Sequence, residues 1–343
     1  MQSVSNLGLA LDSDERVFVR DKVHIVLGDA LDWYDQWPSP TVIISDGPYG
    51  IAGFPGDPPT PDVLAEWYEP HIVAWSKAAT PATTLWFWNS EHGWANVHGV
   101  LQKYGWSFVN CHIWNKGISH IAGNSNTKTL RKYPVVTEVC VQYVRRAEFR
   151  VGHRVMTMQE WLRYEWERSG LPLSKANEAA GVKNAATRKY LTKDHLWYCP
   201  PPDVFERLVA YANQYGDPNG RPYFSLDGKR PLTAKEWANM RPKFYCEPGV
   251  TNVWDEPSVR GPERIKVPDR VNKALHANQK PLKLTERIIR ASSDPGDVVW
   301  APFGGLCTEA IASHKLGRVH YSAEINPRYF KIAIERLKTY DRS

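Results

Sequence analysis

The sequence predicts an α/β protein whose mostly parallel sheet is built from two segments separated by a basic insertion. In the first 145 residues, short apolar runs alternate with segments of helical periodicity, as in parallel strands joined by crossover helices. From about residue 146 this alternation fades, and Arg, Lys, Trp and Pro become frequent. It resumes near residue 271. We therefore expect two halves of one α/β domain, residues 1–145 and 271–343, and an insertion at residues 146–270.

The expected elements follow from these local patterns. Strands are predicted at residues 24–27, 41–44, 83–88, 109–114, 135–143, 297–300 and 319–323. Helices are predicted at residues 62–79, where Asp62 can cap the first turn, and at 281–291, 308–316 and 327–339. In the insertion, three short helices are expected at residues 158–170, 174–181 and 185–191.

The composition is that of a globular protein with a sizeable core. Of 343 residues, 42% are hydrophobic and 23% are charged, which argues against disorder as the default state. No apolar run approaches the ~18 residues of a membrane helix, so no membrane association is expected. The first residues lack the basic segment and long apolar core of a signal peptide. We expect a cytoplasmic protein.

Cysteine and histidine spacing predicts no metal site. The five cysteines are scattered and form no Cys-x-x-Cys pair, and His71, His92 and His98 follow no metal-ligand spacing. The net charge of +6 suits a polyanionic partner, although many enzymes that never bind nucleic acid are equally basic. Trp and Tyr are unusually frequent, with 15 and 16 residues, and most of these rings are expected in the core.

Two loops at the expected ends of strands carry candidate chemistry. The first is Asp46-Gly47-Pro48-Tyr49, a run that would also suit an ordinary tight turn. The second is the glycine turn at residues 302–305, followed by a helix, a strand and Glu324. Ligands in open α/β sheets bind outside the carboxyl ends of strands. A glycine turn lets the backbone approach such a ligand, and an acid one strand later can accept hydrogen bonds from ribose hydroxyls.

Together these motifs resemble the permuted (beta-class) S-adenosylmethionine-dependent DNA amino-methyltransferases, in which the catalytic half precedes the cofactor half. Residues 46–49 resemble that family's catalytic tetrapeptide, which is Asp, Asn or Ser followed by Pro-Pro-Tyr or Pro-Pro-Phe. The family's cofactor segments are matched in order by His276, Gln279-Lys280-Pro281-Leu282, Pro302-Phe303, Gly305, Thr308 and Glu324. Gly28-Asp29 matches the early loop whose acid faces the cofactor adenine, and Trp114, Lys116 and Glu138 resemble the elements that follow it. The resemblance covers residues 23–145 and 272–338.

The resemblance implies a Rossmann-like methyltransferase fold with helices on both faces of the sheet, S-adenosylmethionine as cofactor, and a mainly helical target-recognition region in the insertion. The catalytic residues that it implies are Asp46, Gly47, Pro48 and Tyr49. The cofactor-binding residues that it implies are Asp29, Asp46, His276, Gln279, Lys280, Pro302, Phe303, Gly304, Gly305, Thr308 and Glu324.

Three residues depart from the family pattern. Gly47 replaces the first proline of the tetrapeptide, Ala301 replaces the usual aspartate of the cofactor loop, and Cys307 replaces its second glycine. Because Glu324, Asp29 and Phe303 remain, we interpret the chain as a divergent and active branch.

The tetrapeptide suits methylation of an aromatic amine, whose lone pair is delocalised into the ring. The Asp46 carboxylate and the main-chain carbonyl of Gly47 can accept the two N–H bonds of the amine and localise that lone pair. Tyr49 would stack on the base once it has left the duplex, and Pro48 would stiffen the loop. The Pro-Cys nucleophile of cytosine-C5 enzymes is absent from the sequence.

The insertion contains a segment that resembles a helix-turn-helix. Residues 173–182 are followed across Gly181 by a basic segment at residues 185–190, an arrangement that suits docking in the major groove. Lys183, Arg188 and Lys189 are the predicted DNA-contacting residues. An ordinary helical hairpin explains the same pattern, in which case other loops, such as residues 229–241, would read the bases.

The sequence therefore predicts a site-specific DNA methyltransferase of a prokaryotic cytoplasm, acting in restriction-modification or epigenetic marking on double-stranded DNA with a specific recognition sequence. Asp46 at the first position favours adenine N6, while Ser45 and the unusual Gly47 keep cytosine N4 as an alternative. A non-catalytic DNA-binding protein with a degenerate methyltransferase fold is the alternative that Ala301 suggests. A partner restriction endonuclease and a homodimer are left open.

Overall fold

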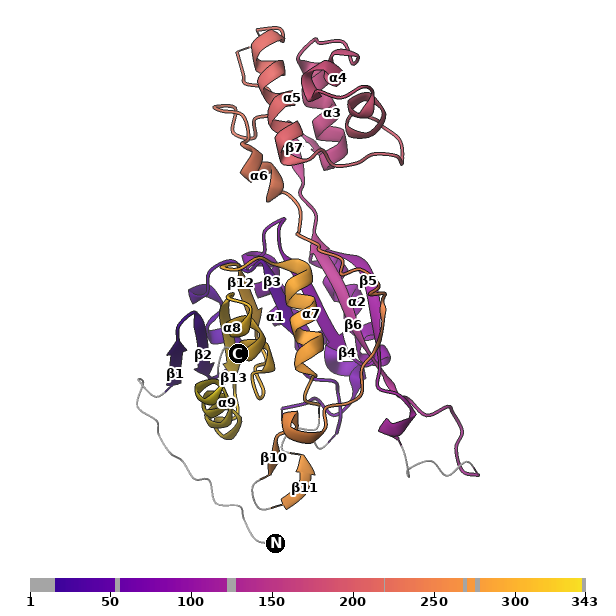
Figure 1. The fold of residues 1–343 in the computed structure, drawn as a ribbon, viewed down its shortest axis with the longest axis vertical. Coiled ribbons are helices and arrows are strands. Elements are labelled where there is room, and N and C mark those ends of the chain that lie inside the picture. The colour runs from indigo at the N-terminus through magenta and orange to yellow at the C-terminus, as the bar shows by residue number, and fades with distance from the viewer. Residues whose placement is uncertain are drawn as a thin grey trace. The chain divides into compact units, whose positions relative to one another are not determined.

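The computed structural model describes residues 16–52, 56–121, 128–218, 220–267, 270–274 and 278–340 (Figure 1). The chain divides into two compact units. The first unit is formed by the chain up to Val144 and from Lys243 onward, and the second by Arg145–Pro242. The second unit starts next to the predicted boundary of the insertion, but it ends before the predicted residue 270.

The predicted end of the insertion is corrected because residues 243–270 include a part of the first unit's sheet. Strand β9 (Val253–Asp255) pairs in parallel with β5 (Trp106–Asn115). Upstream of β9, the Lys243 ammonium lies 2.8 Å from Asp294 and 2.6 Å from Asp297. The proline-rich composition of this segment resembles that of the insertion, and only its long-range pairing assigns it to the first unit.

A nine-stranded sheet forms the centre of the first unit, in the order β1-β2-β13-β12-β3-β4-β6-β5-β9. The five strands from β2 to β4 in this order are mutually parallel, whereas β1 and β6 run antiparallel to their neighbours β2 and β4. The further bounds are β1 Val17–Arg20, β2 Val23–Leu27, β3 Val42–Ser45, β4 Thr84–Asn89, β6 Thr137–Arg145, β12 Val298–Ala301 and β13 Val319–Glu324. The predicted mostly parallel sheet is confirmed.

Helices cover both faces of this sheet, as Figure 1 shows. The helices are α1 Leu64–Ala78, α2 Glu91–Lys103, α7 Leu282–Ser292, α8 Thr308–Lys315 and α9 Pro327–Thr339. Alternate residues of one strand pack on opposite faces: Leu85 and Phe87 join the core under α1 and α2, whereas Trp86 and Trp88 join the core under α7. Period-two alternation with both faces buried is the pattern that an α/β sheet requires.

Shorter elements complete the first unit. They are the turns of 3-10 helix η2 Ala30–Asp32, η3 Tyr34–Gln36, η4 Pro61–Val63, η5 Ile118–His120 and η7 Gly261–Glu263, and the hairpin of β10 Lys266–Val267 and β11 Arg270–Ala274. The predicted cap at Asp62 is wrong, because this residue lies inside η4 and its carboxylate lies 3.3 Å from Nε2 of His92.

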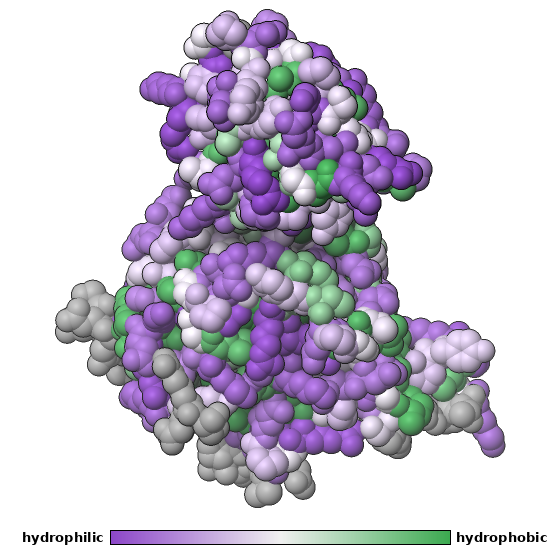
Figure 2. All heavy atoms as spheres, turned by 45° about the horizontal axis from the view of Figure 1, so that its top comes forward, coloured by the Kyte–Doolittle hydropathy of each residue, from purple (hydrophilic) through white to green (hydrophobic). Residues whose placement is uncertain are grey.

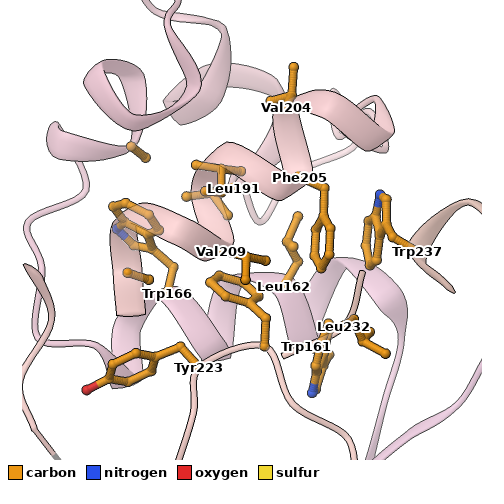
Figure 3. Packing of buried hydrophobic residues seen from close by; sticks show 14 of the residues in the cluster. Trp161, Leu162, Trp166, Leu191, Val204, Phe205, Val209, Tyr223, Leu232 and Trp237 are labelled. Atoms are coloured by element: carbon orange, nitrogen blue, oxygen red, sulfur yellow. The ribbon is translucent and has the colours of Figure 1, made fainter. Parts of the chain in front are cut away.

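The second unit is mainly helical and has its own aromatic core (Figure 3). Its elements are the hairpin of β7 Phe149–Val151 and β8 Arg154–Met156, the helices α3 Met158–Arg168, α4 Lys175–Ala180, α5 Pro202–Tyr215 and α6 Ala234–Ala238, and the π-helical turn η6 Ala186–Tyr190. The rings of Phe205 and Trp237 stack with centroids 4.2 Å apart. The helical nature of the insertion predicted from the sequence agrees with this unit.

A buried carboxylate organises the second unit. Glu165 on α3 is fully buried and accepts hydrogen bonds from Arg168 at 2.6 Å, from Arg221 at 2.6 Å and from the backbone N–H of Phe224 at 2.7 Å. Because these donors come from α3 and from the segment after α5, the carboxylate joins two parts of the unit that are distant in sequence.

We predict that Glu165→Ala lowers the opening free energy of α3 and α5 by about 3–5 kcal/mol. The reason is that Arg168 and Arg221 both lose the carboxylate that they share. Amide hydrogen exchange of the full chain measures this quantity. Glu167→Ala on the same helix is the control, since its pair with Arg163 is half-exposed and contributes at most about 1 kcal/mol. Equal losses in both variants would contradict the prediction.

Candidate active site

The candidate site lies at one edge of the sheet, where neighbouring parallel strands end. Strand β3 leads into Asp46, β12 leads into the glycine loop after Ala301, and β13 ends at Glu324. Strand β2 leads into Gly28 and Asp29, and the N–H of Gly28 donates to the carbonyl of Glu324 at 3.0 Å. The parallel order β2-β13-β12-β3 therefore collects the predicted loops at the edge where α/β proteins bind ligands.

The Asp46 carboxylate belongs to a buried network of charges. Its Oδ1 accepts from the Lys280 ammonium at 2.7 Å and from the Tyr49 hydroxyl at 3.2 Å. The same hydroxyl lies 3.0 Å from Oε2 of Glu138, and the Lys280 ammonium lies 3.3 Å from that oxygen. Lys116 forms a further ion pair with Glu138. Two carboxylates and two ammonium groups are thus balanced around one tyrosine.

The electrostatics of this network keep its members in defined protonation states. Burial would lower the pKa of Lys280, but the carboxylates of Asp46 and Glu138 outweigh burial and raise it above its ordinary value. Burial opposes ionisation of Glu138 too, yet Lys280 and Lys116 lower its pKa. Burial, together with Glu138 and Asp46, raises the pKa of Tyr49, so its hydroxyl stays a neutral donor.

Tyr49 does not offer an accessible ring in this structure. Its side chain is only 5% exposed, and the Lys280 ammonium lies 5.1 Å from the centroid of its ring. Stacking of a base on this ring would require the ammonium to move, so the stacking role stays a prediction. The carbonyl of the neighbouring Pro48 accepts from Tyr68 and Asn89, both at 3.0 Å, which holds the loop in place.

The glycine at position 47 is explained by its contact with the cofactor loop. A Cβ added to Gly47 would lie 2.6 Å from the ring of Phe303 and 2.6 Å from the hydroxyl of Tyr68. The Phe303 ring in turn packs against the aromatic face of α1, with its centroid 5.0 Å from that of His71 and 5.5 Å from that of Trp67. Any side chain at position 47 would displace this packing.

The glycine loop is held by Glu324. Its Oε2 accepts from the N–H of Gly305 and its Oε1 from the N–H of Asn326, both at 2.7 Å. Burial raises the pKa of this carboxyl group to about 7. Gly304 passes close to β13, since a Cβ there would lie 3.1 Å from the carbonyl oxygen of Ala323. Cys307 adopts φ +55°, a left-handed conformation that favours glycine.

Two cavities adjoin these loops. One of about 30 Å³ is lined by Asp46, Asn278, Gln279, Lys280, Phe303, Gly304, Gly305, Leu306, Thr308 and Glu309. A second, of about 290 Å³, is lined by Trp114, Lys116, Ser119, His120, Glu138, Ser258, Val259, Arg260, Arg264, Asn278 and Gln279. Asn278 and Gln279 form a wall common to both cavities. Seven of the predicted cofactor residues therefore share the smaller cavity.

The remaining predicted cofactor residues have other positions. Pro302 lies in the glycine loop, and Asp29 caps η2 by accepting from the N–H of Leu31 at 2.9 Å. The Gln279 amide is engaged by the protein itself, because it donates to the carbonyl of Glu263 at 2.8 Å and accepts from a backbone N–H of the same segment. His276 lies outside the described residues.

Sequence reasoning missed three residues of the smaller cavity, Asn278, Leu306 and Glu309, and of these only Glu309 has an ionisable side chain. It follows Thr308 at the start of α8, and its side chain is 5% exposed. Its neighbours in the sequence are apolar or small. The sequence pattern therefore does not distinguish Glu309 from an ordinary acidic residue in the first turn of a helix. Glu138 and Lys116 were matched to the family without a role, and the structure brings both to the Asp46 network.

The predicted DNA-contacting residues all lie in the second unit. Lys183, Arg188 and Lys189 are exposed on the segment after α4. The side-chain oxygen of Asn177 on α4 accepts a hydrogen bond from the backbone N–H of Thr187 at 3.2 Å, which holds α4 and this segment together. In place of the expected second helix there is the five-residue π-helical turn η6, because the helical backbone conformation ends at Tyr190. The predicted helix at residues 185–191 is therefore corrected to a shorter element.

The three histidines considered in the sequence each have a side-chain partner: His92 lies 3.3 Å from Asp62, and Nδ1 of His98 lies 2.7 Å from the Tyr143 hydroxyl. His71 lies on the buried face of α1 and shares a hydrogen bond with the Tyr34 hydroxyl at 2.9 Å, and burial lowers its pKa to about 4. Within the ranges that the structure describes, no three His, Cys, Asp or Glu side chains form a group that could hold a metal ion. No helix among the described residues is long and apolar enough to cross a membrane.

Comparison with known families decides the family. Residues 41–335 match the model of the N6/N4 family described as DNA methylase. The chain belongs to this family. The match confirms the family predicted from the motifs, and it extends across the insertion as well as both halves of the α/β domain.

Curated relatives match shorter stretches. The DNA adenine methyltransferase YhdJ of Escherichia coli (strain K12) is 42% identical over 86 residues, which are 25% of this chain and 27% of that protein. The type II methyltransferase M.ScaI of Streptomyces caespitosus is 30% identical over 173 residues, 49% of this chain and 50% of its own. The chain thus spans between a quarter and a half of the length of these relatives.

A solved structure shows the same fold at low identity. The PvuII DNA methyltransferase, described as cytosine-N4-specific, has a TM-score of 0.51 at 12% identity, covering 94% of this chain and 88% of its own. Such a likeness concerns the fold alone, and it confirms the predicted Rossmann-like methyltransferase architecture.

We predict that Gly47→Ala destabilises the first unit by about 1–3 kcal/mol, because the added methyl group overlaps Phe303 and Tyr68. Thermal unfolding of the full chain measures the loss. Gly99→Ala on α2 is the control: a Cβ there meets no atom within 4 Å, and alanine should be neutral or stabilising by about 0.5–1 kcal/mol. A Gly47→Ala variant as stable as Gly99→Ala would show that the loop accommodates a side chain.

Proposed function

We propose that this protein is a site-specific DNA methyltransferase that transfers a methyl group from S-adenosylmethionine to the exocyclic amine of a base, with adenine N6 as the favoured target. The observation that supports it best is the meeting of the Asp46 loop with the glycine loop held by Glu324, at one sheet edge of a chain in the DNA methylase family. Family membership supports both the DNA substrate and the cofactor.

The residues of the sheet edge fit the proposed cofactor. Each oxygen of the buried Glu324 carboxylate accepts one backbone N–H, so each keeps a lone pair for a ribose hydroxyl. Phe303, Gly304 and Thr308 line the adjoining cavity. When bound, the cofactor supplies an electrophilic methyl group on a sulfonium.

Asp46 is the proposed catalytic residue. Both of the hydrogen bonds that its carboxylate accepts within the described residues fall on Oδ1, from Lys280 and Tyr49. We assign Oδ2 to one N–H of the target amine and the Gly47 carbonyl to the other. Two preorganised acceptors hold the N–H bonds in an orientation that takes the nitrogen lone pair out of conjugation with the ring and turns it toward the electrophile.

The larger cavity is the proposed place of the target nucleotide. It adjoins the Asp46 network through Glu138, which receives a hydrogen bond from Tyr49. Its lining carries Lys116, Arg260 and Arg264, and such cations suit the phosphates that flank a flipped base. Trp114 adds an aromatic ring to the same wall.

The first residue of the tetrapeptide, Asp46, supports adenine N6 over cytosine N4, which we retain as the alternative base. Nucleoside mass spectrometry of DNA from cells that express the gene identifies the methylated base, and methylation-aware sequencing gives the recognition site. Detection of N4-methylcytosine would replace adenine as the target. A partner endonuclease and a homodimer stay predictions.

We predict that Asp46→Ala lowers single-turnover methyl transfer by at least about 10²–10³-fold, because an acceptor aimed at the reacting amine is lost. Cofactor affinity, measured by calorimetry, should stay within a few-fold, since Lys280 retains Glu138 as a partner. Asp35→Ala is the control, because the pair that Asp35 forms with Lys77 is exposed.

Two outcomes of this experiment would change the proposal. Near-normal turnover of the Asp46→Ala variant would remove Asp46 from catalysis. A wild-type protein that binds DNA but neither S-adenosylmethionine nor its product would support the non-catalytic alternative.

We further propose that the second unit reads the DNA sequence through Lys183, Arg188 and Lys189. These cations are exposed, and on the face drawn in Figure 2 the unit presents mainly hydrophilic residues. Because η6 is a single turn, we assign the contacts to the segment around it rather than to a long recognition helix.

We predict that Lys189→Ala lowers the slope of log affinity against log salt by about one, as expected for one lost phosphate contact. Arg188→Ala should cost about 1–3 kcal/mol of discrimination between cognate and scrambled duplexes if it contacts a guanine edge. Fluorescence anisotropy at several salt concentrations measures both effects. Lys175→Ala is the control, since that ammonium is already paired with Glu178 at 2.7 Å. If both test variants bound DNA as the wild type does, this segment would have a structural role and would not contact DNA.

A further inference from the structure

Glu309 presents a buried carboxylate to the smaller cavity. It is the second residue of α8, its side chain is 5% exposed, and it shares the cavity with Asp46, Gly305 and Thr308. The ion pairs of the described residues do not include it, and the hydrogen bond that its carboxylate accepts comes from its own backbone N–H. A buried carboxylate without a cation is costly, and it is stable only when a partner neutralises it.

The charged groups around Glu309 are already engaged elsewhere. Lys280 acts on it through space but is paired with Asp46 and Glu138. Arg336 on α9 acts on it in the same way, while its guanidinium donates to the carbonyl of Leu306. Neither cation lies within ion-pair distance of the Glu309 carboxylate.

The protonation of Glu309 reflects this isolation. Burial and the negative charge of Asp46 raise its pKa to about 7, against the lowering effects of Lys280 and Arg336. The nearby Cys307 thiol stays neutral, because burial and the Glu309 charge raise its pKa to about 12. The carboxyl group is therefore poised to ionise when a cation arrives, which makes it a receptor for a positively charged ligand.

The cofactor loop of this chain has also lost an acid. Ala301, at the end of β12, stands where the family pattern carries an aspartate, and its side chain is buried. A carboxylate is thus missing at the start of the loop, and a buried one that forms no ion pair with any described residue is present just after its end.

We propose that Glu309 binds the α-ammonium group of the amino-acid part of S-adenosylmethionine and so replaces the acid lost at Ala301. This assignment rests on the proposed function. The ammonium group offers three N–H donors, which a buried carboxylate needs, whereas the sulfonium offers none. The sulfonium also belongs near Asp46, where the target amine must meet the methyl group.

The test compares Glu309→Gln with wild type by calorimetry, using three ligands: S-adenosylmethionine and two analogues of it. S-adenosylhomocysteine keeps the ammonium but lacks the sulfonium, and 5′-methylthioadenosine lacks the whole amino-acid part. At pH 8 we expect Glu309→Gln to lose about ten- to a hundredfold in affinity for S-adenosylhomocysteine, as for a lost charged hydrogen bond. Its affinity for 5′-methylthioadenosine should stay within about twofold.

Other patterns would overturn the assignment. Equal losses for both ligands would mean that Glu309 only shapes the pocket. A loss for S-adenosylmethionine without a loss for S-adenosylhomocysteine would assign the carboxylate to the sulfonium. A wild-type protein that binds none of the three ligands would overturn the proposed function itself, and this assignment with it.

A second experiment asks whether an aspartate restored at position 301 recovers the affinity that Glu309→Gln loses. If Glu309 replaces the aspartate, Ala301→Asp in the Glu309→Gln background should recover most of the affinity for S-adenosylhomocysteine. Ala301→Asp alone is the matched control for any disturbance at the end of β12. Failure of the double variant to recover affinity, while the single variant binds normally, would contradict the exchange of roles.

The stability of the ligand-free protein gives a readout that does not depend on the cofactor. The folded pKa of Glu309, about 7, lies above its ordinary value of 4.5, so the folded state holds this proton more tightly than the unfolded state. Its contribution to stability therefore falls as the pH rises from about 4.5 to 7 and stays low above that. Glu309→Gln should raise the Tm of the ligand-free chain more at pH 8 than at pH 5, and saturating S-adenosylhomocysteine should reverse the order at pH 8. A variant less stable than wild type at both pH values would show that Glu309 stabilises the fold instead.

Discussion

The candidate site depends on the pairing of one buried ammonium group. Lys280 is 1% exposed, and an unpaired charge at that depth would be strongly destabilising. Asp46 from the loop after β3 and Glu138 from β6 neutralise it. Because Lys280 and Asp46 are separated by 234 positions in the chain, this pairing joins the two halves of the α/β domain across the insertion. The pairing fixes the Asp46 carboxylate, and through Glu138 it reaches the Tyr49 hydroxyl.

A second constraint acts between backbone and ring. The loop after β3 can approach the glycine loop only because position 47 has no side chain, and the Phe303 ring fills the space that a Cβ would need. Phe303 is itself held by the aromatic residues of α1. Close packing of rigid rings tolerates little change in volume. The departure from proline at position 47 is therefore coupled to the packing of α1, and it is compatible with an intact loop.

Much of the fold could be predicted from local patterns. The parallel strands were found because both of their faces are buried, which leaves short apolar runs between helical segments. Helix α2 was missed because Gly93, Gly99 and polar residues obscure its apolar periodicity, and α5 was missed because it begins at the third of three consecutive prolines. Strand β9 has three residues and becomes a strand only by pairing with β5. The end of the insertion was misplaced for the same reason.

By itself, the sequence determined the family, the order of the catalytic and cofactor halves, and most residues that line the smaller cavity, because these depend on residue types at fixed local spacing. Only the tertiary structure decided how those residues are used. It buries the Tyr49 ring beneath Lys280, engages the Gln279 amide with residues 263–265, and leaves the Glu309 carboxylate without an ion pair among the described residues. Burial and charge pairing depend on groups that are far apart in the chain. No local pattern of residue types records which of those groups meet.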